Sequence, residues 1–167
     1  VTSTSTVAAI RYTTDGSAPS LANGFDLANG GTVSIAGTTP LMAIAVVAGW
    51  TDSDLTSGTY TLQPAAPRFT PTATTYAATQ TVTISSTTAA ATIRYTTDGS
   101  TPSGTNGVDL ANGGTVAVTR TTTLRAVAVI PGWTDSTAAG GVYTLKAFAP
   151  TFTPGTNTYT AAQTVTI

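Results

Sequence analysis

The chain has 167 residues, contains neither His nor Cys, and sets six basic side chains against seven acidic ones, for a net charge of −1. A charge near zero argues against a nucleic-acid partner, since such surfaces are strongly basic. The missing His and Cys exclude zinc, haem and iron–sulfur ligation, and no apolar run reaches the roughly 18 residues of a membrane span. Threonine makes up about a quarter of the chain and charged residues only 8%, a composition that favours an extracellular, hydroxyl-covered β protein.

The sequence repeats itself with a spacing of 83 residues from one end to the other. Asp15 and Asp98 are separated by this spacing, and so are Trp50 and Trp133. Self-similarity at one period is typical of a tandem array of one folding unit. Boundaries between units fall in linkers, and the Pro- and Ala-rich segments near residues 64–67 and 147–150 have that composition. We therefore predict three parts, which are residues 1–66, 67–149 and 150–167.

The first predicted strands of the complete unit, residues 67–149, show a period of two. Residues 81–84 and 92–96 alternate polar with apolar side chains, as half-buried strands do. Asp98-Gly99 then predicts a turn.

An Asn-Gly pair stands between the next two apolar segments. Residues 108–110 and 115–118 flank Asn112-Gly113. Type I′ turns need positive φ at both central residues, and Asn-Gly supplies it, so we expect a β-hairpin here.

The last two predicted strands lie on either side of a Gly-Trp pair. Residues 124–130 form a long apolar run that suits a central strand, and residues 142–145 close the unit. With the strand that opens each period this makes about seven short strands, with turn signals every ten or so residues. The predicted fold is all-β, with tandem immunoglobulin-like β-sandwiches of about seven strands each.

Three ordered motifs occur in both copies. In the second copy they are residues 93–102 (IRYTTDGSTP), 123–128 (TLRAVA) and 132–136 (GWTDS), followed by Tyr143. The first copy matches through residues 10–19, 41–45 and 49–53, and Tyr60. Together these motifs resemble the chitobiase/β-hexosaminidase C-terminal-like domain. The resemblance implies a small immunoglobulin-like sandwich that serves as a non-catalytic accessory or repeat module of secreted and cell-surface proteins, and it implies no reaction.

The aspartates do not predict an active site. Acid–base catalysis at a glycosidic bond needs two carboxyl groups about 5–10 Å apart, one of them with a raised pKa. Asp15 and Asp98 instead stand in Asp-Gly turns, where the side chain hydrogen-bonds to its own backbone. Asp52 and Asp54 are too few for a Ca²⁺ site, which takes six to eight oxygens. We predict no catalytic residue, no metal and no cofactor.

Two interpretations of Trp50 and Trp133 remain open. The favoured one is that each indole plugs the end of its own sandwich, as large aromatic side chains do in cores. The other is that each forms a platform on which sugar rings stack. In that case the chain is a carbohydrate-binding accessory module of a secreted hydrolase or adhesin, with a cell-surface polysaccharide as its partner.

The two ends of the chain are predicted to complement one another. Residues 1–66 lack the opening segment that residues 67–84 supply to the second copy, and residues 150–167 repeat that segment. Burying its four large apolar side chains contributes about 6–12 kcal/mol, which rivals the whole stability of a small domain, about 5–15 kcal/mol. We therefore expect each tail to complete the next head, either between separate chains or within a longer array.

This complementation predicts a structural extracellular protein that builds a filament, stalk or surface layer, with itself or its neighbouring repeats as partner. The predicted interface residues are Phe152, Tyr159, Val165 and Ile167 on the tail, and Val1, Val7, Ile10 and Tyr12 on the head.

Overall fold

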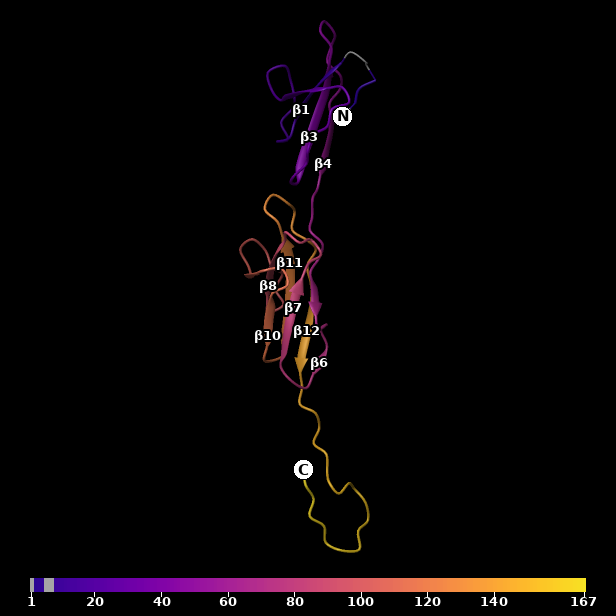
Figure 1. Cartoon of the computed structure of the whole chain (residues 1–167), viewed down its shortest axis with the longest axis vertical. Helices are drawn as coiled ribbons and strands as arrows, with labels where there is room; N and C mark the ends of the chain where they lie inside the picture. Colours follow the sequence, from indigo (N-terminus) through magenta and orange to yellow (C-terminus); the bar gives the residue numbers. More distant parts are fainter. Residues whose placement is uncertain (1, 5–7) are drawn as a thin grey trace.

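The computed structural model describes residues 2–4 and 8–167 (Figure 1). Every regular element in it is a β-strand, which confirms the predicted all-β class. No helical segment with the length and apolar character of a membrane span occurs among these residues. The first repeat (residues up to 66), the second repeat (residues 67–149) and the tail (residues 150–167) follow one another along the long axis of the molecule (Figure 1).

The first repeat consists of one antiparallel sheet with the strand order β2-β1-β3-β4. Its strands are β1 (Ala9–Thr13), β2 (Phe25–Ala28), β3 (Thr39–Val46) and β4 (Thr56–Tyr60). No second sheet pairs with or covers this one in the described part of the first repeat. One face of a half-buried sheet carries its apolar side chains, so this arrangement leaves that face without its usual cover.

The second repeat is a sandwich of two sheets. The smaller sheet has the order β10-β7-β5 and the larger one β6-β12-β11-β8-β9. Their bounds are β5 (Arg68–Thr70), β6 (Thr75–Tyr76), β7 (Gln80–Ser85), β8 (Thr92–Thr96), β9 (Val108–Leu110), β10 (Thr115–Val118), β11 (Thr122–Val129) and β12 (Ala139–Leu145). Strands β8, β9, β11 and β12 are the counterparts of β1 to β4, so the opening segment with β5 to β7 is what makes this repeat a sandwich.

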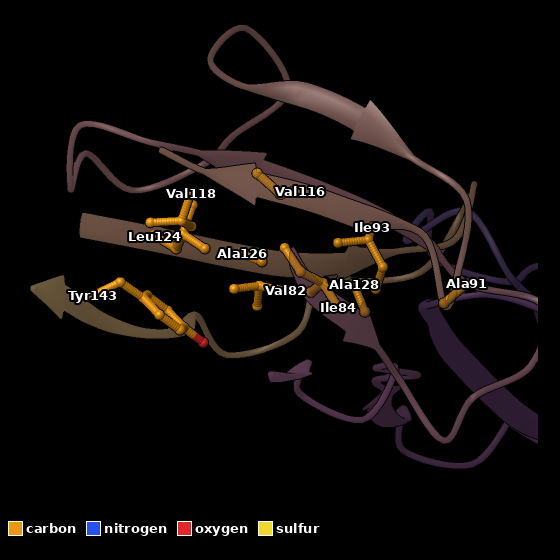
Figure 2. Close-up of a cluster of buried hydrophobic side chains, with 10 residues drawn as sticks. All are labelled: Val82, Ile84, Ala91, Ile93, Val116, Val118, Leu124, Ala126, Ala128 and Tyr143. Carbon is orange, nitrogen blue, oxygen red and sulfur yellow. The ribbon is translucent and has the colours of Figure 1, made fainter. Parts of the chain in front are cut away.

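The core of the second repeat lies between its two sheets (Figure 2). Val82 and Ile84 on β7 are fully buried and face the strands of the larger sheet. Tyr143 on β12 is also fully buried, and its hydroxyl donates a hydrogen bond to the carbonyl of Pro71 at 2.7 Å. Its ring stacks on Tyr76 with 6.2 Å between ring centroids. The opening segment therefore supplies both apolar contacts and a polar partner to the core.

The expected hairpin at Asn112-Gly113 is wrong. β9 pairs with β8 in the larger sheet, whereas β10 pairs with β7 in the smaller one. The Asn112 side chain accepts a hydrogen bond from the Ser86 amide at 2.7 Å and donates one to the Ser86 carbonyl at 3.0 Å. Only Gly113 has a positive φ, since no non-glycine residue of the described chain does. Asn112 thus ties the turn to the end of β7, and the chain crosses between sheets there.

Strand β10 has no counterpart in the first repeat. Residues 32–35 read TVSI where β10 reads TVAV, yet they form no strand. The two sequences are nearly the same, so local propensity does not explain the difference. β10 pairs with β7, and a strand at this place needs such a partner for its backbone groups.

The core position of β7 predicts the effect of one substitution. Ile84→Ala should lower the free energy of unfolding of the second repeat by about 2–5 kcal/mol, because it leaves a cavity between the sheets. Thr81→Ala, on the exposed face of the same strand, should change it by less than about 0.5 kcal/mol. Urea denaturation followed by circular dichroism measures both, and equal effects would contradict this account of the core.

Candidate functional site

The two repeats meet at a joint made of backbone hydrogen bonds and one indole. The Trp133 Nε1–H donates to the carbonyl of Ala36 at 2.9 Å. The Thr38 amide donates to the carbonyl of Gly132 at 2.8 Å, and the Thr134 amide donates to that of Leu62 at 2.9 Å. We call the residues of the first repeat that take part in the joint, 36–38 and 62–63, the base of that repeat.

Two side-chain bonds and a close backbone approach complete the joint. The hydroxyls of Thr38 and Thr134 share a hydrogen bond at 3.1 Å. The Gln63 amide nitrogen donates to the carbonyl of Asp135 at 2.6 Å. A Cβ atom on Gly37 would lie 2.8 Å from the Gly132 carbonyl oxygen, closer than real Cβ contacts allow. Position 37 is therefore a glycine because the neighbouring backbone occupies the space of a side chain.

The interpretation of the tryptophans as core plugs is wrong. Trp50 is 69% exposed, and Trp133 is half-buried with its N–H bonded to the neighbouring repeat. Both indoles sit on a corner, residues 49–52 and 132–135, that projects beyond the end of the sheet. The physical reason is the turn itself, since Gly49 and Gly132 have φ near +80° and lead the chain away from the strand.

The two corners have the same internal structure. The Trp50 amide donates to Val47 and the Trp133 amide to Ile130, both at 3.0 Å. A serine hydroxyl then accepts from the preceding strand in each case, Ser53 from the Ala45 amide at 2.9 Å and its counterpart in the second repeat at 2.8 Å. The corner of the first repeat is thus already in the conformation that makes the joint in the second.

The uncovered face of the first repeat is an open groove. It contains cavities of about 350 Å³ and 420 Å³, lined by inward-facing residues of the sheet that include Leu41, Ala43 and Tyr60. Tyr60 is 53% exposed, whereas its counterpart Tyr143 is fully buried. The groove occupies the place that β5 to β7 fill in the second repeat.

A polar clasp marks one end of this groove. The Ser3 amide donates to Asn29 Oδ1 at 2.8 Å, and Asn29 Nδ2 donates to the Ser3 carbonyl at 3.0 Å. The bonds between Ser86 and Asn112 have the same pattern. Residues 2–4 therefore lie where the chain leaves β7 in the second repeat, and the groove extends back from that point.

The tail keeps the local structure of residues 67–84. The Tyr159 hydroxyl donates to Gly155 at 2.6 Å, as that of Tyr76 donates to Thr72 at 2.6 Å. Thr153 pairs with Thr166 in an isolated bridge, at the positions where β5 pairs with β7 in the second repeat. Each hydrogen bond found in the described tail joins two tail residues, and the tail extends away from the second repeat (Figure 1).

The structure places the predicted interface residues in different environments. The four on the tail, Phe152, Tyr159, Val165 and Ile167, are between 42% and 79% exposed. On the head, Ile10 is buried and lines the groove, and the Tyr12 ring packs on Phe25 with 5.6 Å between centroids. Val1 and Val7 lie outside the described residues. The tail thus presents to solvent the side chains whose counterparts form a core.

The recurring aspartates are held by short-range partners. Asp15 and Asp98 each accept two hydrogen bonds from the serine two residues later, at 2.9 and 2.6 Å. These bonds hold the pKa of both carboxyl groups below its ordinary value. Asp26 pairs with Arg11 at 3.0 Å and Asp109 with Arg94 at 2.7 Å. No cluster of three or more potential metal ligands was found in the described chain.

Comparison with known proteins finds a family model that matches the second repeat. Residues 71–140 match the family model of the chitobiase/beta-hexosaminidase C-terminal domain. This confirms the resemblance predicted from the motifs. An endoglucanase of Clostridium saccharobutylicum is 46% identical over 65 residues, which is 32% of this chain and 14% of that protein. The chain therefore corresponds to a small part of this relative. No solved structure matches.

The sequence analysis did not predict the role of the base residues. The Ala36 carbonyl, Gly37 and Gln63 take part through backbone atoms or a single amide, and such contacts leave no motif. One signal was present, because the two copies differ here. Gly37 corresponds to Arg120, and Gln63 to Lys146. The structure brings both Gly37 and Gln63 to the joint, so this difference between otherwise similar repeats was the available signal.

The close approach at Gly37 predicts that a methyl group disrupts the joint. Gly37→Ala should weaken the contact between repeats by about 1–3 kcal/mol, as overpacking does, and widen the range of their relative orientations. Residual dipolar couplings measured separately for each repeat report this. Gly58→Ala, where nothing lies within 4 Å of the added atom, is the matched control, and an unchanged orientation in Gly37→Ala would contradict the joint.

The lowered pKa of Asp98 predicts a shift that depends on Ser100. The folded pKa lies below the ordinary value of about 3.9, so this carboxylate stabilises the fold above pH 4 and the contribution is lost as the pH falls through the folded pKa. Ser100→Ala should move the pKa of Asp98 back up. Carboxyl ¹³C NMR titration measures it, with Asp15 in the first repeat as the internal control.

Proposed function

We propose that the chain is a non-catalytic accessory module of a secreted glycoside hydrolase, in which the repeats act as an elongated spacer. The observation that carries this proposal is the joint. Five hydrogen bonds and the close approach at Gly37 connect one repeat to the next, so that the two lie end to end (Figure 1). A fixed end-to-end arrangement holds whatever it connects at a set distance, which a flexible linker does not do.

The comparisons support the accessory role. The matched family takes its name from the C-terminal part of chitobiase and beta-hexosaminidase, and the relative with 46% identity is an endoglucanase. An accessory of such enzymes works where polysaccharides are found, which supports a secreted or cell-surface location. The low charge and high threonine content agree with that location.

The carboxyl groups support a non-catalytic module. A glycosidase needs one carboxylic acid that stays protonated, and hence a raised pKa. Asp15, Asp98 and Asp109 have lowered pKa values because hydrogen bonds stabilise their charged forms. These side chains serve turns and a surface ion pair.

A second candidate is sugar binding at Trp50. Its indole is 69% exposed, as a stacking platform requires. Trp133, the counterpart of Trp50 in the second repeat, does not support sugar binding. Its indole N–H donates a hydrogen bond to a protein carbonyl, that of Ala36. The contact that the Trp133 corner makes with the first repeat supports the spacer, which is therefore our first candidate.

A polysaccharide pull-down separates the two candidates. The chain should not be retained by insoluble cellulose or chitin beyond the level of an inert protein of similar size, and Trp50→Ala should behave like the parent. Retention that Trp50→Ala removes, with the fold intact by circular dichroism, would replace the spacer by a carbohydrate-binding module.

A scattering measurement tests the spacer directly. Small-angle X-ray scattering at low protein concentration should give one elongated particle for the parent chain. Trp133→Ala should broaden the distance distribution because it removes the indole from the joint. A parent chain as flexible as this variant would contradict the proposal.

A further inference from the structure

We propose that the first repeat binds a single sugar ring at the loop that joins β1 to β2. The ring of Phe25 is the platform for the sugar, and the side chains of Asp15 and Asn23 accept hydrogen bonds from its hydroxyl groups. The ligand class is a soluble pyranoside with equatorial hydroxyl groups. The proposal does not rest on the spacer role, and it concerns a different place from the Trp50 corner.

A cavity of about 300 Å³ opens between the end of β1 and the start of β2. This volume lies at the lower end of the range for ligand pockets, so the cavity suits one sugar ring rather than a chain of them. Its wall combines an aromatic ring with carboxylate, amide and hydroxyl groups, and a sugar likewise has both apolar C–H groups and hydroxyls. The lining residues are Thr13, Thr14, Asp15, Asn23, Gly24 and Phe25.

Phe25 forms the apolar wall of this cavity. It is 61% exposed and stands on the edge strand β2, opposite Tyr12. The two ring centroids lie 5.6 Å apart with an angle of 38° between the ring planes. The contact with Tyr12 steadies the Phe25 ring while most of that ring stays open to a ligand. Because the face of an aromatic ring carries partial negative charge, it attracts the slightly positive C–H groups on the face of a pyranose.

Asp15 offers an acceptor to the ligand. The Ser17 amide and the Ser17 hydroxyl both donate to Asp15 Oδ1, at 2.9 and 2.6 Å. These bonds leave Oδ2 to accept from a sugar hydroxyl, and bonds to a charged acceptor are stronger than neutral ones. The two bonds from Ser17 also hold the carboxylate in place before a ligand arrives, so binding does not have to order it.

Asn23 supplies a second acceptor at a fixed position. Its Nδ2 donates to the Ser17 hydroxyl at 2.9 Å and to the Ala18 carbonyl at 2.8 Å. An amide nitrogen has two hydrogens, and both are used inside the loop, so Oδ1 is the group that Asn23 presents to a ligand. The Ser17 hydroxyl donates to Asp15 and accepts from Asn23, which keeps the two acceptors at a set spacing.

The loop has the same structure in the second repeat, which has both of its sheets. The Ser100 amide and hydroxyl donate to Asp98 Oδ1 at 2.9 and 2.6 Å, and Asn106 Nδ2 donates to the Ser100 hydroxyl at 3.0 Å. Val108, the counterpart of Phe25, is 58% exposed there. The loop structure and the exposure of this position therefore do not depend on whether the sheet is covered.

The two repeats differ at the platform. Five of the six lining residues are the same in the second repeat, and only Phe25 is replaced, by Val108. Valine has no ring on which a sugar can stack. The second repeat is therefore a built-in control, with the same acceptors and no platform, and we expect it to bind no sugar.

The expected affinity is low because the cavity is open. A site with about two hydrogen bonds and one stacking contact binds in the millimolar range. Binding this weak does not retain a protein on an insoluble polysaccharide, so it is compatible with the pull-down result expected of the spacer. It is detected in solution, with a soluble sugar in excess.

Amide NMR spectra of the full chain test the site. The probe is methyl β-D-glucopyranoside, whose equatorial hydroxyls leave C–H groups on both ring faces, and the control is sorbitol, which has hydroxyls and no ring. The glycoside should shift the amides of residues 14–15 and 23–25 in a saturable way and leave residues 97–98 and 106–108 unchanged. Equal shifts in both repeats, the same response to sorbitol, or no saturable shift would overturn the proposal.

Exchanging the platform residue between the repeats tests the role of the ring. Phe25→Val should weaken binding by about tenfold, because it gives the first repeat the side chain of the second. Val108→Phe should create a second site, seen as new shifts at residues 97–98 and 106–108. Both positions are exposed, and the dispersion of the spectrum checks that each variant is folded. A folded Phe25→Val variant that binds like the parent would overturn the platform.

A neutral side chain at position 15 tests the acceptor. Asp15→Asn should weaken binding by about fivefold, because it replaces a charged acceptor by a neutral amide. Asp98→Asn, the same change in the repeat without a platform, is the matched control and should leave binding as in the parent. Equal affinities of Asp15→Asn and the parent would contradict the role given to this carboxylate.

Discussion

The structure depends on one constraint, which is that the apolar face of a β-sheet must be covered. In the second repeat the cover is the small sheet of β10, β7 and β5, and the side chains of Val82 and Ile84 are fully buried between the two sheets. In the first repeat the same face is lined by Leu41, Ala43 and Tyr60 and remains a groove. The presence or absence of one segment of about 18 residues decides between these two states.

This constraint acts on local structure as well as on the core. Residues 32–35 and 115–118 have nearly the same sequence, but only the latter form a strand, because only they have β7 to pair with. The burial of a side chain depends on the covering sheet in the same way. Tyr60 in the first repeat is half exposed, whereas its counterpart Tyr143 in the second repeat is fully buried. The two repeats within one chain thus compare the same sequence with and without its complement.

The joint between repeats follows a different principle. It is built mainly from backbone donors and acceptors. Its side-chain bonds come from the indole of Trp133, the amide of Gln63 and the hydroxyls of Thr38 and Thr134. The polar contacts fix orientation, because hydrogen bonds are directional. Gly37 permits the close backbone approach in the first repeat, whereas the corresponding Arg120 gives the second repeat a basic surface. The accessory role depends on this joint, since a spacer needs repeats that meet in a defined geometry.

The amino-acid sequence alone was enough for the all-β class, the family resemblance, the 83-residue period and the turns at Asp15 and Asp98. These features depend on local patterns such as alternation, Asp-Gly pairs and repeated motifs. The sequence was misleading at Asn112-Gly113, where the side chain of Asn112 bonds to Ser86 and the chain changes sheets. It was also misleading at Trp50, whose place outside the core depends on the turn at Gly49. Only the tertiary structure decided which strands pair, where the indoles lie and which carbonyls they meet, because those contacts join residues far apart in the chain and use backbone atoms that every sequence has.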